Sequence, residues 1–552
     1  MSQLHAKAAT TPASPAASSE RRRALTGLML CAPLGLSPLG GCGSGGGGGG
    51  SSPPSVPPVP PPPPPLPPGP PVNGPPWPGF ARNPQHSAVG AIASQPLTQI
   101  RWITPVDLAP PYSGSALLAH YGSPVISARN TVIVPVKTTA SGGFRIEARL
   151  GSNGNLLWST DSDYVFPAHN WVPSFNPCIT AGNRMYAPRS GGRLLFRDDV
   201  DATTGAIQTA VFYGAATYAA APAVYDSVIR INTPLTADAA GNLFFGFVAT
   251  GANPAGLVSG IARLAADGTG IWVAASTAAA SAAIGQVAMN CAPALSADGL
   301  TLYVAVNTPP VAGTRQSGFL LALDSATLAT VARVALTDPV SGTPAWVSDN
   351  ATSSPTIGPD GDVYFGVLEA DAPAHNFRGW LLHFNAALSL SKTPGSFGWD
   401  TTASIVPAAM IPGYAGPSTY LLATKYNNYY GAGGDGRNRV AVLDPNQTQP
   451  DAIVDIAVMR EMLSRLGPTP DPGTPAGVKE WCINTAAVDP LTRSILINNE
   501  DGMLYRWDLP SNQFVERIAL TSGLAAAYTP TVIGPDGAVY AVNNAVLFSV
   551  GR

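Results

Sequence analysis

The fold is decided by the stretch Ser354-Pro355-Thr356-Ile357-Gly358-Pro359-Asp360-Gly361-Asp362-Val363-Tyr364-Phe365, because the chain uses it twice. It returns near the C-terminus as Thr529-Pro530-Thr531-Val532-Ile533-Gly534-Pro535-Asp536-Gly537-Ala538-Val539-Tyr540. Both copies contain a short apolar strand, an Asp-Gly turn and a second apolar strand. Asp-Gly suits a tight hairpin because these residues tolerate positive φ. A hairpin that recurs along a chain indicates a repeat architecture.

Looser copies of this hairpin divide the chain into eight units. The units open at or near Pro124, Pro177, Pro234, Pro293, Pro355, Pro407, Thr485 and Pro530. Successive openings lie about 58 residues apart on average, which leaves room for four short strands in each unit. Four antiparallel strands per unit predict an all-β fold, an eight-bladed β-propeller.

The last unit is one strand short, because the chain ends at Arg552 directly after the apolar run Val546–Val550. We expect the N-terminal strand Leu97–Trp102 to complete this eighth blade, since ring closure leaves no open sheet edge. One helix is expected, at Ala452–Leu466 in the long sixth unit. No long apolar period of 3.6 residues runs through the rest of the repeats, which disfavours a helical solenoid.

The first 79 residues are predicted to be an export signal and a tether. Arginines 21–23 precede a modestly apolar run, which is typical of a bacterial signal. The run ends in Leu39-Gly40-Gly41-Cys42, which resembles the bacterial lipobox and implies that Cys42 is lipidated. The expected organisation is therefore a signal at 1–41, a disordered Gly/Ser- and Pro-rich tether at 42–79, and the propeller at 80–552.

The tether has a soft part and a stiff part. Gly43–Ser52 is almost pure Gly and Ser, and Pro53–Pro71 is nearly all Pro. The Pro-rich part is expected to form a polyproline II rod of roughly 60 Å, at about 3.1 Å per residue. Such a tether would hold a domain away from a membrane. The alternative is a Pro-rich ligand for aromatic grooves on other proteins.

Composition excludes some classes of partner. Net charge is −3 and only 11% of residues are charged, so no basic field indicates nucleic acid. The predicted propeller contains three cysteines, Cys178, Cys291 and Cys482, which is an odd number. We interpret them as small buried residues of the inner strands, although pairing of two of them stays open.

Other motifs resemble a known family. Gly154-Asn155-Leu156-Leu157-Trp158 and Gly268-Thr269-Gly270-Ile271-Trp272 are similar to the fourth-strand signature of quinoprotein-type propellers. Asp201-Ala202-Thr203-Thr204-Gly205 resembles the Asp-x-x-Thr-Gly turn of the same family. The family contains dehydrogenases that use pyrroloquinoline quinone and calcium, and scaffolds without a cofactor. The resemblance therefore implies the fold and leaves the function open.

Two polar stretches carry more chemistry than a repeat framework requires. They are the loop Lys425–Asn438 and the segment Lys479–Thr485, which we expect to meet at one mouth of the channel. The ligand-binding candidates are Lys425, Asn427, Asn428, Tyr429, Glu480, Trp481 and Asn484. Their carboxylate and amide oxygens suit a calcium ion, and Trp481 is expected to stack on a planar ligand. The alternative is that these groups only satisfy the backbone of irregular loops.

The favoured function is noncatalytic. We expect an exported lipoprotein, periplasmic or on the cell surface, that binds or scaffolds an envelope protein or a small polar ligand. One alternative is an alcohol or aldose dehydrogenase dependent on pyrroloquinoline quinone and calcium. The adjacent cysteine pair of the family's alcohol and methanol enzymes is missing, which counts against it. The other alternative is a carbohydrate-binding propeller that uses the Tyr/Asn loop. No catalytic residue is assigned.

Overall fold

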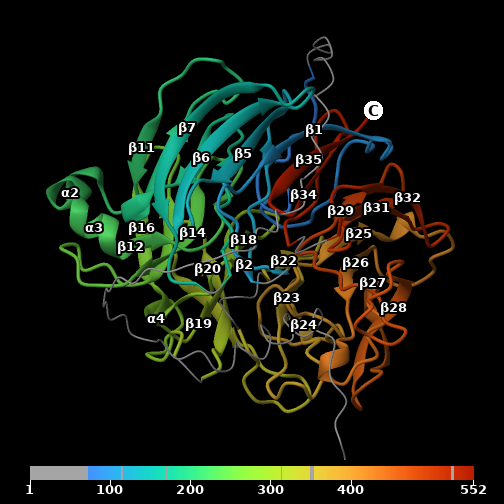
Figure 1. Cartoon of the computed structure of the whole chain (residues 1–552). Coiled ribbons are helices and arrows are strands. Elements are labelled where there is room, and N and C mark those ends of the chain that lie inside the picture. The colour runs from blue at the N-terminus through green and yellow to red at the C-terminus, as the bar shows by residue number, and fades with distance from the viewer. Residues whose placement is uncertain (1–71, 114–115, 170, 312–313, 348–352, 524–527) are drawn as a thin grey trace, which may run out of the picture.

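The chain folds into a ring of eight antiparallel sheets. The computed structural model describes residues 72–113, 116–169, 171–311, 314–347, 353–523 and 528–552. Figure 1 shows the sheets arranged in a ring, with the chain running once around it. The prediction of an eight-bladed β-propeller is confirmed.

The first four blades follow chain order. Blade 1 contains β4 (Val125–Ile126), β5 (Thr131–Lys137), β6 (Gly142–Leu150) and β7 (Leu156–Val165). Blade 2 contains β8 (Cys178–Ile179), β9 (Met185–Pro188), β10 (Arg193–Arg197) and β11 (Gln208–Val211). Blade 3 contains β12 (Ile229–Ile231), β13 (Thr236–Ala237), β14 (Leu243–Ala249), β15 (Gly260–Leu264) and β16 (Gly270–Ala274). Blade 4 contains β17 (Gln286–Val287), β18 (Ala294–Leu295), β19 (Thr301–Asn307), β20 (Gly318–Asp324) and β21 (Thr330–Ala335).

The other blades continue around the ring to the C-terminus. Blade 5 contains β22 (Thr356–Ile357), β23 (Val363–Val367) and β24 (Trp380–Phe384). Blade 6 contains β25 (Ser404–Pro407), β26 (Tyr420–Tyr426), β27 (Arg439–Pro450) and β28 (Ala457–Leu466). Blade 7 contains β29 (Ala487–Asp489), β30 (Ser494–Asn498), β31 (Met503–Asp508) and β32 (Gln513–Ala519). Blade 8 contains β33 (Val532–Ile533), β34 (Val539–Asn543), β35 (Val546–Gly551) and β1 (Gln99–Pro105).

The remaining elements are short. A two-stranded ladder joins β2 (Tyr112–Ser113) to β3 (Ala116–Leu117). The helices are α2 (Ala215–Ala220), α3 (Pro222–Val228) and α4 (Ala275–Ala278), with 3₁₀ turns η1 (Ser190–Gly192), η2 (Ala408–Met410) and η3 (Tyr430–Ala432). No helix in the described ranges is both long and apolar enough to cross a membrane.

The ring closes through the N-terminal strand, as the sequence predicts. β1 pairs antiparallel with β35, from Gln99 opposite Gly551 to Pro105 opposite Val546. The strand thus begins two residues later than expected and extends three residues beyond Trp102. β1 and the C-terminal strand β35 lie side by side in one blade, so neither leaves an open edge where they meet.

The expected helix at Ala452–Leu466 is wrong. Ala457–Leu466 forms β28, which pairs with β27 in a long hairpin. Blade 5 has only three strands among the described residues, and the tip of this hairpin packs against its core through Val454, Ile456 and Val458. Burial against the neighbouring blade therefore overrides the local helix propensity of the segment.

The ring has two sides, which differ in the loops that they carry. The lower mouth of the channel is the side of the hairpins that join first to second strands. The upper mouth is the side of the connections that enter the first strands and of the loops that join second to third strands. Residues 74–90, named here the N-terminal segment, lie across the lower mouth, where Trp77 and Ile126 form a backbone bridge. Gly74 N–H already donates to Ala128 of blade 1, so the propeller domain begins before residue 80.

Candidate ligand-binding site

The two polar stretches meet at the upper mouth, between blades 6 and 7. Asn427 follows β26 and holds Trp481, which precedes β29. Its Nδ2 donates to the Trp481 carbonyl at 3.0 Å, and its Oδ1 accepts from the Trp481 N–H at 3.1 Å. Asn427 is fully buried, so these bonds fasten the two stretches to one another. Its amide acts here as a structural link.

Trp481 belongs to the hydrophobic core. Its side chain is fully buried, and its ring lies 5.8 Å from Tyr505 and 5.6 Å from Phe514, centroid to centroid. The expectation that Trp481 stacks on a ligand is therefore wrong, because no face of the ring is exposed. Sequence reasoning missed this because the partners come from blade 7 strands that follow it.

The Tyr/Asn loop is held by its own side chains. Asn428 Nδ2 donates to Asp435 Oδ1 at 2.8 Å, and Asn428 Oδ1 accepts from Asn376 at 3.2 Å. Tyr429 is buried, and its hydroxyl accepts from Asn427 at 3.3 Å. Burial, and next the negative charge of Glu480, raise the pKa of Tyr429 well above 10. The loop is thus ordered internally and offers few side chains to a sugar.

Lys425 is the candidate whose side chain is least completely hydrogen-bonded by the described residues. It is the last residue but one of β26 and is 1% exposed. Among the described residues, its recorded acceptor is Asp400 Oδ2 at 3.4 Å. The ammonium also lies 5.4 Å from the Tyr528 ring centroid and 5.7 Å from that of Phe397. A buried ammonium carries three donors, and within the described ranges this one makes a single long hydrogen bond.

Three aromatic residues that the sequence did not single out as candidates, His120, Trp171 and Tyr528, lie near Lys425 and Asp400. His120 lies between β3 and β4, and its Nε2 is 3.9 Å from Asp400 Oδ1. The His120 ring stacks on Trp171 at 5.2 Å and meets Tyr528 edge-on at 4.6 Å. Trp171 and Tyr528 are half-buried. The three residues share one feature of the sequence that could have found them: each lies shortly before the first strand of a blade.

A second group joins two carboxylates and a thiol. Ligand atoms of Glu480, Cys482 and Glu500 all lie within 4.8 Å of one another. Cys482 Sγ donates to Glu500 Oε2 at 3.2 Å, and the Glu480 N–H donates to Glu500 Oε1 at 3.2 Å. Asn484, the last candidate, uses its carbonyl to accept from the Thr402 N–H at 3.0 Å.

The three cysteines of the propeller form no disulfide within the described part of the chain. Cys178, Cys291 and Cys482 are buried and unpaired with one another. Burial raises the pKa of Cys178 and of Cys291 to about 12, so neither is a thiolate at neutral pH. Their interpretation as small buried residues is confirmed.

These residues fit a quinone and calcium only in part. Lys425 suits a carbonyl or carboxylate oxygen of such a ligand, and Trp171 and Tyr528 present aromatic surface beside it. Trp481 does not supply a platform, and the Glu480 group contains a thiol, whereas calcium prefers oxygen ligands alone.

Comparisons with known proteins agree on the fold. No protein-family model matches the chain, and no curated protein is similar to it. A europium-containing methanol dehydrogenase superposes with a TM-score of 0.52 at 9% identity, over 85% of this chain and 89% of its own. The quinohemoprotein alcohol dehydrogenase from Comamonas testosteroni superposes with a TM-score of 0.50 at 11% identity, over 87% and 81%. The chain shares the propeller fold of these enzymes.

A weaker superposition is with BamB from Moraxella catarrhalis, at a TM-score of 0.42 and 11% identity, over 82% of this chain and 99% of that one. At identities this low, likeness shows fold and not activity. What this chain does must be argued from its own residues.

Proposed function

We propose that the protein is a noncatalytic binding module of the cell envelope, which holds a small polar ligand with an anionic group at its upper mouth. The observation that carries the proposal is the incomplete hydrogen bonding of Lys425. Burying an ammonium group without full partners is costly, so the fold retains it for a reason other than stability. An anionic ligand would supply the missing acceptors.

The surroundings of Lys425 favour a ligand with a flat apolar part. Trp171 and Tyr528 are half-buried and flank His120, and the Tyr528 ring lies 5.4 Å from the Lys425 ammonium. Aromatic rings beside a few convergent polar groups are typical of small-molecule sites. A compact carboxylate with a planar body matches this combination.

Thermal shift titrations with benzoate and with inorganic phosphate test this proposal. We expect benzoate to raise the melting temperature of the wild-type protein, and Lys425→Met to weaken the effect at least tenfold. Lys392→Met is the matched control, because Lys392 is half-exposed and pairs with Asp362. Equal responses of the wild-type protein and Lys425→Met would contradict the proposal, and so would a wild-type protein that responds to neither anion.

A quinone-dependent dehydrogenase is the second candidate, favoured by Lys425 beside Asp400 under aromatic rings. Titration with pyrroloquinoline quinone and calcium separates the two functions. A tight coloured complex with dye-linked oxidation of alcohols or aldoses would establish the enzyme. Absence of a complex at micromolar quinone would remove this candidate and leave the binding module.

The envelope location is proposed from Cys42 and the Pro-rich tether. Lipidation at Cys42 would anchor the protein, and residues 53–71 would hold the ring roughly 60 Å from the surface. Cys42→Ala should release the protein into the soluble fraction after cell breakage. Unchanged fractionation of that variant would refute the anchor and leave the ligand site untouched.

A further inference from the structure

Three side chains that can ligate a metal converge at the upper mouth of blade 7. Ligand atoms of Glu480, Cys482 and Glu500 all lie within 4.8 Å of one another. In the described part of the chain, this is the one group of three or more His, Cys, Asp or Glu side chains whose ligand atoms come so close. Cys482 is 2% exposed, whereas Glu480 and Glu500 are half-buried. The group therefore joins an inner thiol to two carboxylates that solvent can reach.

The backbone that carries these side chains is fixed on both sides. Trp481, which separates the first two ligands, is fully buried, and Asn427 bonds both its N–H and its carbonyl. Glu500 belongs to the hairpin turn between β30 and β31, and its Oε1 accepts from the Glu480 N–H at 3.2 Å. Ligands that are already held in place lose little conformational freedom when they bind an ion.

The distances suit a tetrahedral zinc ion. Zinc binds thiolate sulfur at about 2.3 Å and carboxylate oxygen at about 2.0–2.2 Å, so a tetrahedral centre separates the two atoms by about 3.6 Å. Cys482 Sγ lies 3.2 Å from Glu500 Oε2, to which it donates its hydrogen. A zinc ion in place of that hydrogen requires the sulfur and the oxygen to separate by only about 0.4 Å.

Negative charge gathers beside this group. Two carboxylates at such a distance repel one another, and a divalent cation between them removes the repulsion. Tyr429 lies within reach of the same charge. Its pKa is raised first by burial and next by Glu480, with smaller contributions from Asp400 and Cys482. The electrostatic field at this part of the upper mouth therefore favours a cation.

The neighbour of Glu500 gives a second indication of a hydrated ion. Asn499 is 1% exposed, and neither its Oδ1 nor its Nδ2 has a hydrogen-bond partner among the described residues. Buried amides without partners are costly and uncommon. Water molecules that complete the coordination shell of an ion at Glu500 are suitable partners for such an amide.

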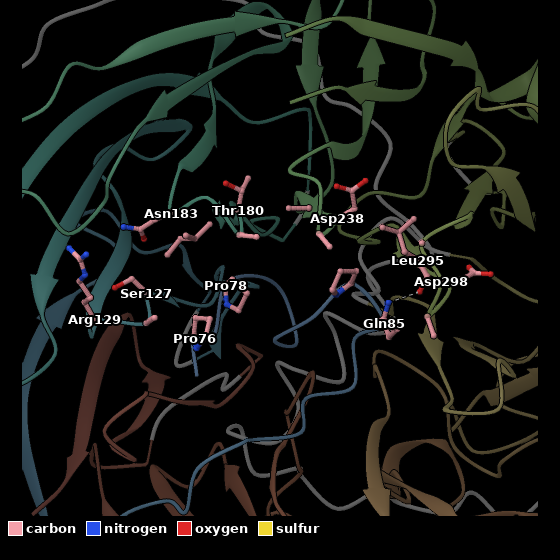
Figure 2. Close-up of a pocket in the computed structure, with 18 of the residues that line it drawn as sticks. Pro76, Pro78, Gln85, Ser127, Arg129, Thr180, Asn183, Asp238, Leu295 and Asp298 are labelled. Atoms are coloured by element: carbon pink, nitrogen blue, oxygen red, sulfur yellow. Dashed lines mark hydrogen bonds between the residues drawn. The ribbon is translucent and has the colours of Figure 1, made fainter. Parts of the chain in front are cut away.

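The aspartates of the lower mouth show that acidity alone does not predict a metal site. Asp238 and Asp298 line a groove of about 570 Å³, and Figure 2 shows them apart, on the hairpins of different blades. Each is used within its own hairpin, since Asp238 accepts from Asn242 at 2.6 Å and Asp298 accepts from Ser296 at 2.5 Å. These carboxylates stabilise turns and do not converge on one point.

We propose that Glu480, Cys482 and Glu500 bind one zinc ion, with water in a fourth position. Binding breaks the S–H bond of Cys482, forms a zinc–sulfur bond and releases the proton to solvent, and nothing is oxidised or reduced. Thiolate selects zinc over calcium and magnesium, which prefer oxygen ligands alone. The site uses none of the side chains assigned to the anionic ligand, so it stands independently of the proposed function.

Cobalt(II) is the probe, because it binds to zinc sites and absorbs by thiolate-to-metal charge transfer where a cysteine is a ligand. The protein is the full chain with Cys31→Ser and Cys42→Ser, so that no thiol outside the propeller contributes. We expect one cobalt ion to bind saturably with this absorption, and zinc but not calcium or magnesium to displace it. Cys482→Ser should abolish the absorption. Cys178→Ser, at another buried thiol, is the matched control and should leave it unchanged.

Calorimetric titration with zinc tests the carboxylates. Glu500→Gln should weaken zinc binding at least tenfold. Glu461→Gln changes a half-buried carboxylate of β28 and should leave the affinity unchanged. If Cys482→Ser fails to fold, the Glu500→Gln titration decides. The proposal is overturned if the wild-type protein binds no zinc saturably, if the cobalt absorption survives Cys482→Ser, if Glu500→Gln binds zinc as tightly as the wild-type protein, or if calcium binds as tightly as zinc.

Discussion

Two lysines occupy the same place in different blades, and their surroundings differ. Lys137 is the last residue of β5 in blade 1, Lys425 is the last but one of β26 in blade 6, and each is 1% exposed. Lys137 Nζ has three close acceptors at 2.8 Å, which are Asp107 Oδ1 and the carbonyls of Ala109 and Thr139. Lys425 has one acceptor at 3.4 Å in the described part of the chain. Burial alone therefore does not distinguish the two lysines, whereas their hydrogen bonding does.

Replacing Lys137 should have the largest effect on stability. Lys137→Met leaves Asp107 buried without its cation, although Tyr121 and the Ala109 N–H still donate to that carboxylate. Removing one partner of a buried ion pair costs about 3–5 kcal/mol. We expect a loss of this size in the free energy of unfolding, measured by urea denaturation at pH 7. A loss below about 1 kcal/mol would show that the pair is not structural.

His86 is another buried basic residue, and it stays neutral in the folded protein. Burial lowers the pKa of His86 from 6.5 to about 4. The unfolded chain therefore binds a proton near pH 6.5 before the folded chain does, and stability is highest above pH 6.5. It should fall as the pH drops from 6.5 towards 4, by roughly 3 kcal/mol in total from this residue.

The pH profile of the free energy of unfolding measures this contribution. The difference between the wild-type protein and His86→Gln isolates it, because all other groups titrate in both proteins. We expect the wild-type protein to lose more stability than His86→Gln between pH 7 and pH 4.5. Parallel profiles would mean that His86 has the same pKa in the folded and the unfolded state.

Among the candidate residues, Asn427 is expected to stabilise the fold and not to bind the ligand. Asn427→Ala leaves the N–H and carbonyl of Trp481 without their partner in a buried place. An unsatisfied buried polar group costs about 1–3 kcal/mol, so we expect a stability loss of about 2 kcal/mol. Ligand binding at Lys425 should persist in the folded fraction. Urea denaturation and the benzoate titration check both parts, and a stable variant that no longer binds would assign Asn427 to the ligand.

The blades and their closure are predictable from sequence because hairpin chemistry is local. Asp360-Gly361 and Asp536-Gly537 specify turns within a few residues, and their recurrence specifies the ring. The N-terminal segment has no such signal, because it is held by backbone bonds from strands up to about 400 residues away.

The upper-mouth site is predictable only in part, for a related reason. Lys425 and Asn427 stand out as polar residues at the end of an apolar strand, so sequence patterning finds them. His120 and Tyr528 come from opposite ends of the chain, and only the closed ring places their rings 4.6 Å apart. Trp481 looks like a ligand platform in sequence, yet its burial depends on Tyr505 and Phe514 in the following strands.

Among these variants, Lys425→Met should have the smallest effect on stability. Lys425→Met removes one long hydrogen bond and leaves Asp400 close to His120. Because Lys425 makes one long hydrogen bond, whereas Lys137 has three close acceptors, we expect a change below about 1 kcal/mol in the free energy of unfolding. The same change at Lys137 should cost several times more. If the two variants lose equal stability, Lys425 is as structural as Lys137, and the case for a ligand at the upper mouth fails even though the fold stands.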